Sequence, residues 1–168
     1  MMKHPKIQIV IRDFGTLTAE LYPEKAPKTV ENFLSLVDEG FYSGMIFHRV
    51  IKGFMIQGGG YDESFGEKHA KAIPGEFRAN GFMGNDLHHA PGVLSMARTQ
   101  DPDSASSQFF IMHKDADYLD SQYAAFGQVT DGMELVDRIA SLPTGRRGWF
   151  DDVPKTAVVI DRVERIAD

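Results

Sequence analysis

The sequence contains no cysteine, which excludes disulfide bridges, thiol nucleophiles, iron–sulfur clusters and cysteine-ligated zinc. It also contains no apolar run near the ~20 residues that a membrane span needs. The first residues, Met-Met-Lys-His-Pro-Lys, are charged and lack the apolar segment of a signal peptide. We therefore predict a cytoplasmic protein that does not enter a membrane.

Positive charge is in deficit, because 18 Lys and Arg residues stand against 24 Asp and Glu residues, a formal net charge of −6. This charge repels a phosphate backbone unless the basic residues are strongly segregated, so nucleic acid is not expected as a partner. The chain of 168 residues is long enough to bury one core, and its 42% of hydrophobic residues is typical of globular proteins. We predict a single domain over residues 1–168.

The spacing of apolar residues predicts two helices and seven or eight strands. One helix is expected over residues 29–39, where apolar side chains recur at i, i+3, i+4 and i+7. A second should begin at Asp131 as N-cap, with Glu134 completing a capping box, and should end before Pro143. The strands are predicted at residues 7–11, 17–21, 45–51, 54–57, 92–98, 108–112, 124–129 and 157–166.

The absence of strand–helix–strand alternation favours an antiparallel sheet over a parallel one. A mainly β protein with this many short strands most economically forms a closed antiparallel β-barrel, with the two α-helices at its ends. The stretch from residue 58 to residue 91 is too long for a simple connector, and we expect it to fold over the outer face of the barrel.

Several motifs point to no established chemistry. Gly58-Gly59-Gly60 lacks the lysine of a phosphate-binding loop and is predicted to form a bulge or tight bend. His88 and His89 are adjacent and lack the spacing of metal ligands, so we interpret them as surface loop residues. No serine lies in a Gly-x-Ser-x-Gly turn, which argues against hydrolysis. We expect neither a metal nor a cofactor.

Apolar and amide side chains are dense around Arg49. Strand alternation places Met55 and Gln57 on one face, and it also places Gln108 and Phe110 on one face of a later strand. Met and Phe beside two glutamines and an arginine make both a poor core and a poor solvent-exposed face. The pattern predicts an apolar pocket edged by a few directed hydrogen-bond donors.

Three blocks in these segments, residues 47–59, 92–98 and 107–111, resemble the signature blocks of the cyclophilin family of peptidyl-prolyl cis–trans isomerases. The similarity extends at lower density over almost the whole chain, and it is closest to the bacterial cytoplasmic branch. The resemblance implies an eight-stranded antiparallel barrel capped by two helices. It also implies catalysis of rotation about X-Pro bonds in unfolded or partly folded polypeptides, without a metal or cofactor.

The resemblance assigns roles to individual residues. Arg49 matches the catalytic arginine of the family. The residues that match its substrate-binding groups are Phe54, Met55, Phe110 and Leu119 in the proline pocket, Gln57, Gln108 and the backbone of Ala97 and Arg98 along the substrate main chain, and Tyr118 and Tyr123 beside the pocket.

Three of these positions depart from the eukaryotic pattern. Tyr118 stands where many eukaryotic members have tryptophan, Tyr123 where they have histidine, and Arg98 where they have asparagine. The tryptophan is associated with binding of cyclosporin-type cyclic peptides, so weakened affinity for them is expected. Tyr123 is expected to line the pocket, and the Arg98 charge to alter preference beside it.

An always-protonated arginine can donate a hydrogen bond to the prolyl nitrogen as the amide twists, without any proton transfer. Such a group serves catalysis more than binding, so an enzyme is the first hypothesis. The alternative is a proline-peptide binding module or holdase chaperone with little turnover. An oligomeric structural protein ranks last, because neither predicted helix shows a second apolar face, and a monomer is expected.

Overall fold

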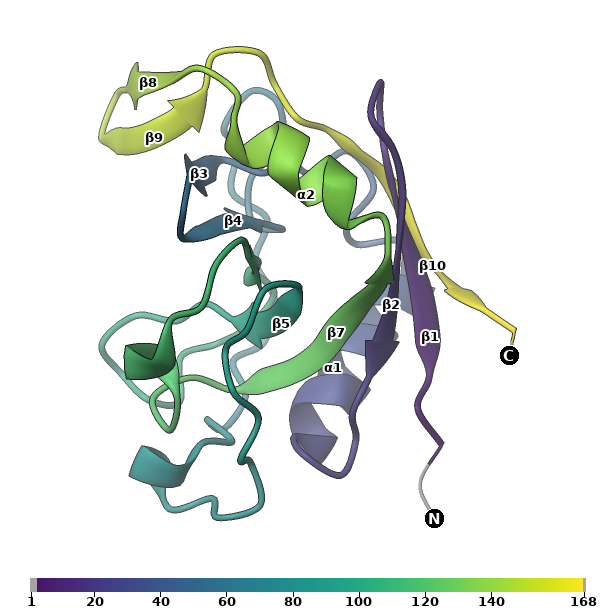
Figure 1. The fold of residues 1–168 in the computed structure, drawn as a ribbon, viewed down its shortest axis with the longest axis vertical. Coiled ribbons are helices and arrows are strands. Elements are labelled where there is room, and N and C mark those ends of the chain that lie inside the picture. Colours follow the sequence, from purple (N-terminus) through teal and green to yellow (C-terminus); the bar gives the residue numbers. More distant parts are fainter. Residues whose placement is uncertain (1–2, 168) are drawn as a thin grey trace.

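The computed structural model describes residues 3–167, so Met1, Met2 and Asp168, at the ends of the predicted domain, lie outside the described residues. Its main feature is an eight-stranded antiparallel sheet in the order β10-β1-β2-β7-β5-β6-β4-β3 (Figure 1). The strands of this sheet are β1 (Lys6–Ile11), β2 (Gly15–Leu21), β3 (Arg49–Ile51), β4 (Met55–Gly58), β5 (Val93–Met96), β6 (Phe109–Met112), β7 (Ala125–Asp131) and β10 (Ile160–Ile166).

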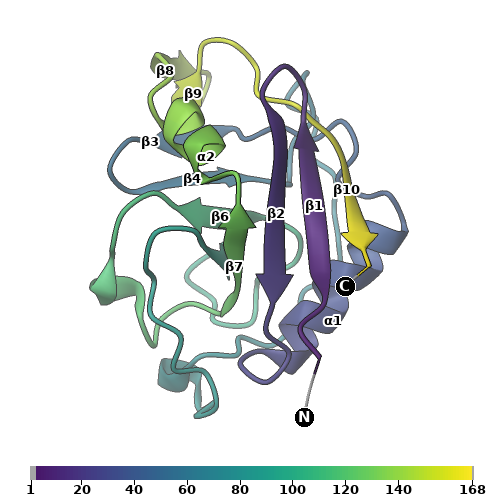
Figure 2. The same cartoon turned by 45° about the vertical axis from the view of Figure 1, so that its right-hand side comes forward.

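The sheet curls strongly, as the views in Figures 1 and 2 show. Residues next to its two edge strands approach each other: Ile46 and Val159 form an isolated bridge, and the N–H of Phe47 donates to the carbonyl of Val158 at 3.0 Å. Within residues 3–167, β3 and β10 themselves share no ladder. The predicted mainly β, antiparallel architecture is confirmed as a strongly curled half-barrel, whereas full closure is not shown.

Both predicted helices are present, α1 (Pro27–Asp38) and α2 (Met133–Ala140). Helix α1 packs against β10, and α2 packs against β2, β3 and β4. The predicted capping box of the second helix is wrong, because Asp131 ends β7 and Gly132 is the N-cap, with φ of 97° and no side-chain cap. Glycine tolerates this left-handed conformation. No helix of the described part of the chain is long and apolar enough to cross a membrane.

A separate hairpin of β8 (Thr144–Arg147) and β9 (Phe150–Pro154) follows α2. The sequence pattern does not predict this hairpin, because Pro143 marks only the end of the second predicted helix and no alternating apolar run follows it before residue 157. The hairpin packs beside β3 through β9 and carries Trp149 at its exposed tip. The final strand, predicted from residue 157, begins only after this hairpin has returned to the sheet.

The long stretch between β4 and β5 covers the outside of the fold and supplies a cap to α1. The Glu76 carboxylate is buried and accepts hydrogen bonds from the Thr29 N–H at 2.6 Å and from the Thr29 hydroxyl at 2.7 Å. The N-cap residue Ala26 offers no side-chain acceptor, and Glu76, 47 positions after Thr29, supplies one instead. A carboxylate is favoured there by the unpaired N–H groups and the dipole of the helix. A short 3-10 turn, η1 (Arg78–Asn80), follows.

The two faces of the central strands enter two separate apolar clusters. Ile56, Phe109 and Ile111 belong to the main core inside the curl of the sheet. Met55 and Phe110, which alternate with them, belong to a smaller cluster on the opposite face. The predicted alternation is therefore confirmed, and the smaller cluster forms the base of the candidate site.

Candidate functional site

A cavity of about 140 Å³ lies over the smaller cluster and gathers most of the predicted site residues. Its lining consists of Arg49, Phe54, Met55, Gln57, Ala97, Arg98, Phe110, Leu119 and Tyr123. Gln108 lines an adjoining cavity of about 270 Å³ instead. Tyr118 lies outside both and is 68% exposed, with its ring stacked against Phe54 at 6.1 Å between centroids. A larger cavity of about 350 Å³ lies beside the β8–β9 hairpin, but none of the predicted site residues lines it.

Arg49 is held at the edge of the cavity by a chain of amides. Strand pairing places it opposite Gln57, and Nη1 of Arg49 donates to Oε1 of Gln57 at 3.0 Å. Nε2 of Gln57 in turn donates to Oε1 of Gln108 at 3.0 Å. Among residues 3–167 no carboxylate forms an ion pair with Arg49. A half-buried, oriented cation thus faces the cavity without a neutralising partner.

The floor of the cavity is apolar and tightly packed. Met55 is 1% exposed, Phe110 5% and Leu119 7%. The Tyr123 ring stands perpendicular to that of Phe110, with centroids 5.8 Å apart. Apolar walls lower the local dielectric constant, and this strengthens any hydrogen bond that Arg49 makes there.

Arg98 lines the cavity, but the contacts of its guanidinium are mainly with neighbouring groups of the protein. Its guanidinium lies 4.6 Å from the Tyr123 ring centroid and 4.8 Å from that of Phe77. Its Nη2 donates to the carbonyl of Gln122 at 2.7 Å. Arg98 therefore fixes the Tyr123 wall. Phe77 completes this stack, and nothing in its local sequence indicated a place near the site.

Part of the backbone beside Arg98 is already hydrogen-bonded within the protein. The N–H of Ala97 donates to the carbonyl of Gln108 at 3.0 Å. This N–H is therefore engaged inside the protein and does not point to a bound ligand as a free donor.

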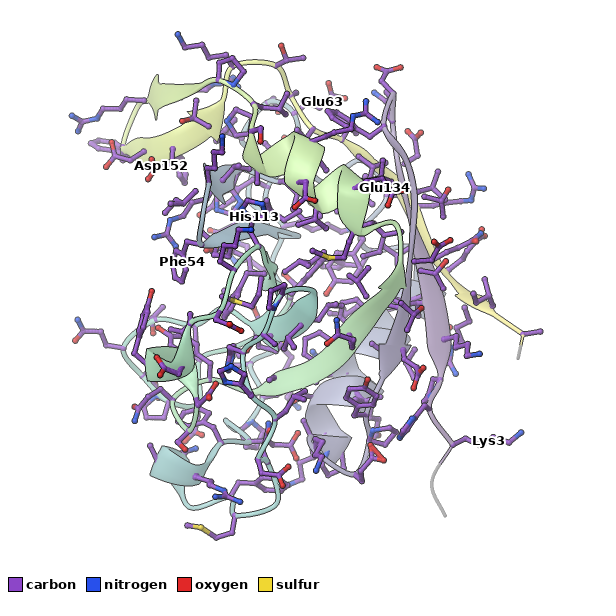
Figure 3. The ribbon with its side chains drawn as sticks, viewed as in Figure 1. Lys3, Phe54, Glu63, His113, Glu134 and Asp152 are labelled. Atoms are coloured by element: carbon purple, nitrogen blue, oxygen red, sulfur yellow. The ribbon has the colours of Figure 1, made fainter. Side chains whose placement is uncertain are left out.

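His113 supports the Phe54 wall and was missed in the sequence. The Nδ1 atom of His113 accepts from the backbone N–H of Gly53 at 2.9 Å. The backbone N–H of His113 donates to the carbonyl of Phe54 at 2.8 Å. Figure 3 shows both residues near β4, with His113 on the side of α2. Its Nε2 lies 2.9 Å from a carboxylate oxygen of Asp137 on α2, so the helix is tied to the pocket wall.

His48 lies outside the cavity, as expected from alternation with Arg49. It is 5% exposed and packs edge-on against the rings of Tyr61 and Phe150. Its Nδ1 has no hydrogen-bond partner within the described chain, so at this atom His48 does not act as a structural hydrogen-bonding residue. Burial, reinforced by the positive charge of Arg49, lowers the pKa of His48 to about 4.

Nothing in the described segment 3–167 brings three or more His, Asp or Glu side chains together in a metal-binding group. His88 is exposed and pairs with two carboxylates, whereas the neighbouring His89 is fully buried. The prediction that both are surface residues is therefore wrong for His89. Burial of this side chain depends on contacts with residues 95 and 120, which strand alternation alone does not reveal.

The glycine triplet forms the predicted tight bend, with φ of 91° at Gly59. At Gly60 an added Cβ would lie 2.5–2.7 Å from the side-chain atoms of Gln108. On the substrate-binding role that the family resemblance implies for Gln108, we expect Gly60→Ala to displace Gln108, break its bond to Gln57 and lower kcat/KM for an X-Pro peptide by about tenfold to a hundredfold, because small misplacements of a positioning group are costly. Stability should change little, since a flexible side chain moves.

The matched control for this change is Gly145→Ala, whose added Cβ meets only a side-chain carbon of Lys155 at 3.5 Å, an ordinary contact. Both variants are compared by NMR exchange on the same peptide and by thermal unfolding. Unaltered turnover in Gly60→Ala would show that the position of Gln108 is irrelevant to the reaction.

Comparison with known proteins gives a consistent result. The profile of the family described as "Cyclophilin type peptidyl-prolyl cis-trans isomerase/CLD" matches residues 6–165. Peptidyl-prolyl cis-trans isomerase B of Escherichia coli K12 is 45% identical over 157 residues, covering 89% of this chain and 93% of that protein. A peptidyl-prolyl cis-trans isomerase of Acinetobacter baylyi is 46% identical over 157 residues, covering 90% and 81%.

Solved structures agree with these relatives. A cyclophilin-type isomerase from Cryptosporidium parvum superimposes with a TM-score of 0.84 at 28% identity, over 98% of this chain and 99% of that one. The structure of the same isomerase in the presence of the dipeptide Ala-Pro gives a TM-score of 0.82, also at 28% identity, over 97% and 99% of the two chains.

Proposed function

Because the chain belongs to the cyclophilin family and is a peptidyl-prolyl cis–trans isomerase, we propose that Arg49 is its catalytic residue and that the cavity beside it binds the proline ring. The observation that carries this assignment is the geometry of Arg49. Its guanidinium is half-buried over an apolar floor, oriented by Gln57 and free of ion pairs within residues 3–167. Arg98, the other cation in the lining, differs because its guanidinium donates to the Gln122 carbonyl and packs on the Tyr123 ring.

The chemistry follows from the electronic structure of the amide. The X-Pro bond resists rotation because the nitrogen lone pair is shared with the carbonyl, which gives a barrier of about 20 kcal/mol. In the twisted state the lone pair is localised on nitrogen, and a fixed N–H donor stabilises that state more than either planar isomer. Arg49 supplies this donor without a proton transfer. The apolar floor holds the ring, so one side of the bond turns against the other.

The proposed substrates are proline-containing segments of unfolded or partly folded polypeptides. The cavity of about 140 Å³ is small and has an apolar floor of Met55, Phe110 and Leu119, which suits one proline ring. The flanking main chain is proposed to lie in the adjoining cavity, whose lining includes Ala97, Arg98 and Gln108. The Ala-Pro dipeptide present with the C. parvum relative is consistent with this substrate class. A binding module or holdase with little turnover is the alternative, and Arg49 argues against it.

Exchange spectroscopy on a short Ala-Pro peptide tests this proposal. We expect catalytic amounts of protein to broaden and exchange the cis and trans signals. In the ¹⁵N-labelled protein, peptide should perturb the signals of Gln57, Ala97 and Phe110. Peptide binding at these residues without accelerated exchange would support the binding module, and perturbations elsewhere would contradict the proposed site.

Cyclosporin-type cyclic peptides are proposed to bind with weakened affinity. Tyr118 is exposed and stacks on Phe54, so a larger ring with an indole N–H donor can be placed there without disturbing the core. We expect Tyr118→Trp to tighten binding of cyclosporin about tenfold, measured by calorimetry. Tyr118→Phe, which removes the hydroxyl and adds no donor, should leave the affinity close to that of the unaltered protein.

A cytoplasmic location, a monomeric state and a single domain over residues 1–168 stay predictions. Cell fractionation tests the first, sedimentation equilibrium the second and a single cooperative unfolding transition the third.

A further inference from the structure

His89 is fully buried directly against the pocket floor. Its exposed fraction is 0%, and its ring stacks on that of Phe110 with centroids 6.1 Å apart and an interplanar angle of 20°. His89 does not line the cavity. It therefore supports Phe110 from within the protein.

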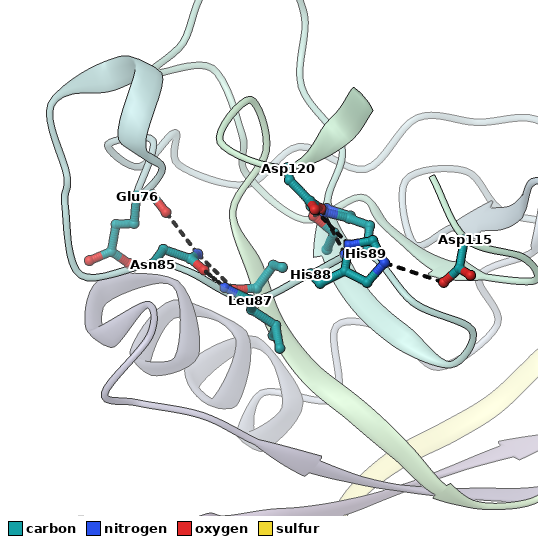
Figure 4. A network of polar contacts seen from close by, with 9 residues as sticks. Glu76, Asn85, Leu87, His88, His89, Asp115 and Asp120 are labelled. Carbon is teal, nitrogen blue, oxygen red and sulfur yellow. Dashed lines mark hydrogen bonds and ion pairs between the residues drawn. The ribbon is translucent and has the colours of Figure 1, made fainter. Parts of the chain in front are cut away.

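The two ring nitrogens of His89 each have a partner. Nδ1 lies 2.8 Å from Oδ1 of Asp120, which also accepts the backbone N–H of His89 at 2.8 Å. Nε2 lies 2.9 Å from Oγ of Ser95, a residue that is 0% exposed. A carboxylate only accepts, so Nδ1 carries the proton and Nε2 accepts from the Ser95 hydroxyl. Figure 4 shows the Asp120 carboxylate beside both His88 and His89.

These bonds connect two parts of the pocket that are distant in sequence. Ser95 on β5 is paired in register with Phe110 on β6, so it is next to the floor residue. Asp120 directly follows Leu119, the last residue of the 3-10 turn η2 (Asp117–Leu119) and part of the cavity lining. The N–H of Ala116 before this turn donates to the His89 carbonyl at 3.0 Å. One side chain thus joins the floor to the η2 wall.

We propose that His89 is a positioning residue for isomerisation. Together with Asp120 and Ser95, it holds the side chains of Phe110 and Leu119 at the correct position relative to Arg49. This role rests on the proposed catalytic arrangement, and His89 itself touches no substrate. Loss of the two bonds would leave a pocket that still accepts proline but no longer presents the prolyl nitrogen correctly to Arg49. A loss of kcat with little change in KM is the expected signature.

The charged groups around His89 make the arrangement sensitive to acid. They are the Asp120 carboxylate and His88, which also contacts Asp120 and lies 3.3 Å from Asp115. Burial lowers the pKa of His89, and Asp120 opposes this effect. Once protonated, Nε2 donates to Oγ of Ser95 instead of accepting from it, so the Ser95 hydroxyl has to turn its own proton to another acceptor. Acidification should therefore loosen the floor through Ser95.

Three variants and one control variant test the proposal at a temperature where each is folded. His89→Phe keeps a ring against Phe110 and removes both side-chain bonds, and Ser95→Ala removes one of them. We expect each to lower kcat about tenfold, with KM within about twofold. Asp120→Asn keeps an acceptor for Nδ1–H and should retain most of the activity. His88→Gln, an exposed change in the same loop, should behave like the unaltered protein.

A pH profile separates positioning from simple packing. In the unaltered protein kcat should fall on acidification in step with the NMR titration of His89, and this step should be absent from Ser95→Ala. Folded His89→Phe and Ser95→Ala proteins with unaltered kcat would overturn the proposal, and Ser95→Ala alone decides it if His89→Phe does not fold. If the proposal for His89 fails, Arg49→Ala should still lower turnover. Failure of the proposal for His89 can therefore be distinguished from failure of the proposed catalytic arrangement.

Discussion

Arg49→Ala is expected to lower kcat/KM for an X-Pro peptide by about a hundredfold to a thousandfold, the loss typical of removing one preorganised donor from a transition state. The donor is fixed by its bond to Gln57 at 3.0 Å, so little reorganisation is needed when the amide twists. Since the pocket floor is untouched by the change, peptide affinity should fall far less than turnover. Stability should be nearly unaltered, because Arg49 is half-buried and has no ion pair in the described chain.

NMR exchange and calorimetry on the same peptide measure the two quantities. Arg49→Lys keeps the charge but loses the planar fork that bonds Gln57, and we expect a rate between those of Arg49→Ala and the unaltered protein. Arg162→Ala, at an exposed arginine on β10, is the matched control for loss of one positive charge. Equal turnover in Arg49→Ala and the unaltered protein would refute the assignment, and binding without turnover in both would favour the binding module.

The parts of the fold that the sequence predicts are those set by local periodicity. Alternation in a strand has a period of two, so it correctly separates Phe109 and Ile111 from Phe110 and Met112 without knowledge of the partner strands. That Met55 shares the face of Phe110 follows from the pairing of β4 with β6, which alternation alone does not give. Most of the cavity lining follows from this separation together with the family resemblance.

The features that the sequence reading missed depend on contacts between distant segments. Glu76 caps a helix 47 residues before it, and the burial of His89 depends on Asp120, 31 residues later. Neither segment shows periodicity, and a carboxylate or histidine in a polar loop usually remains solvated. The start of α2 was misplaced for a related reason: the turn uses the left-handed conformation of Gly132, whereas the prediction relied on a side-chain cap at Asp131.

A second large effect is expected from His48, whose neutral form the fold stabilises. Its pKa is lowered from 6.5 to about 4 by burial and by Arg49, so the unfolded chain binds more protons between these values. The contribution of His48 to the free energy of unfolding is fully present above pH 6.5 and is lost as the pH falls toward 4. At about 1.4 kcal/mol per pKa unit, the loss from this group is about 3 kcal/mol.

His48→Phe isolates this contribution, because it keeps an aromatic ring against Tyr61 and Phe150 and removes both the titration and the unpartnered Nδ1. Chemical unfolding of both proteins at pH 7 and pH 4 gives the measurement. Because the two proteins differ only at this residue, the stability of the variant relative to the unaltered protein should rise by about 3 kcal/mol on acidification. A relative stability that is independent of pH would mean that His48 becomes protonated in the folded protein as easily as in the unfolded chain. The aromatic cage around it would then have to be open to water, and the link it makes between β3 and the β8–β9 hairpin would have to be loose.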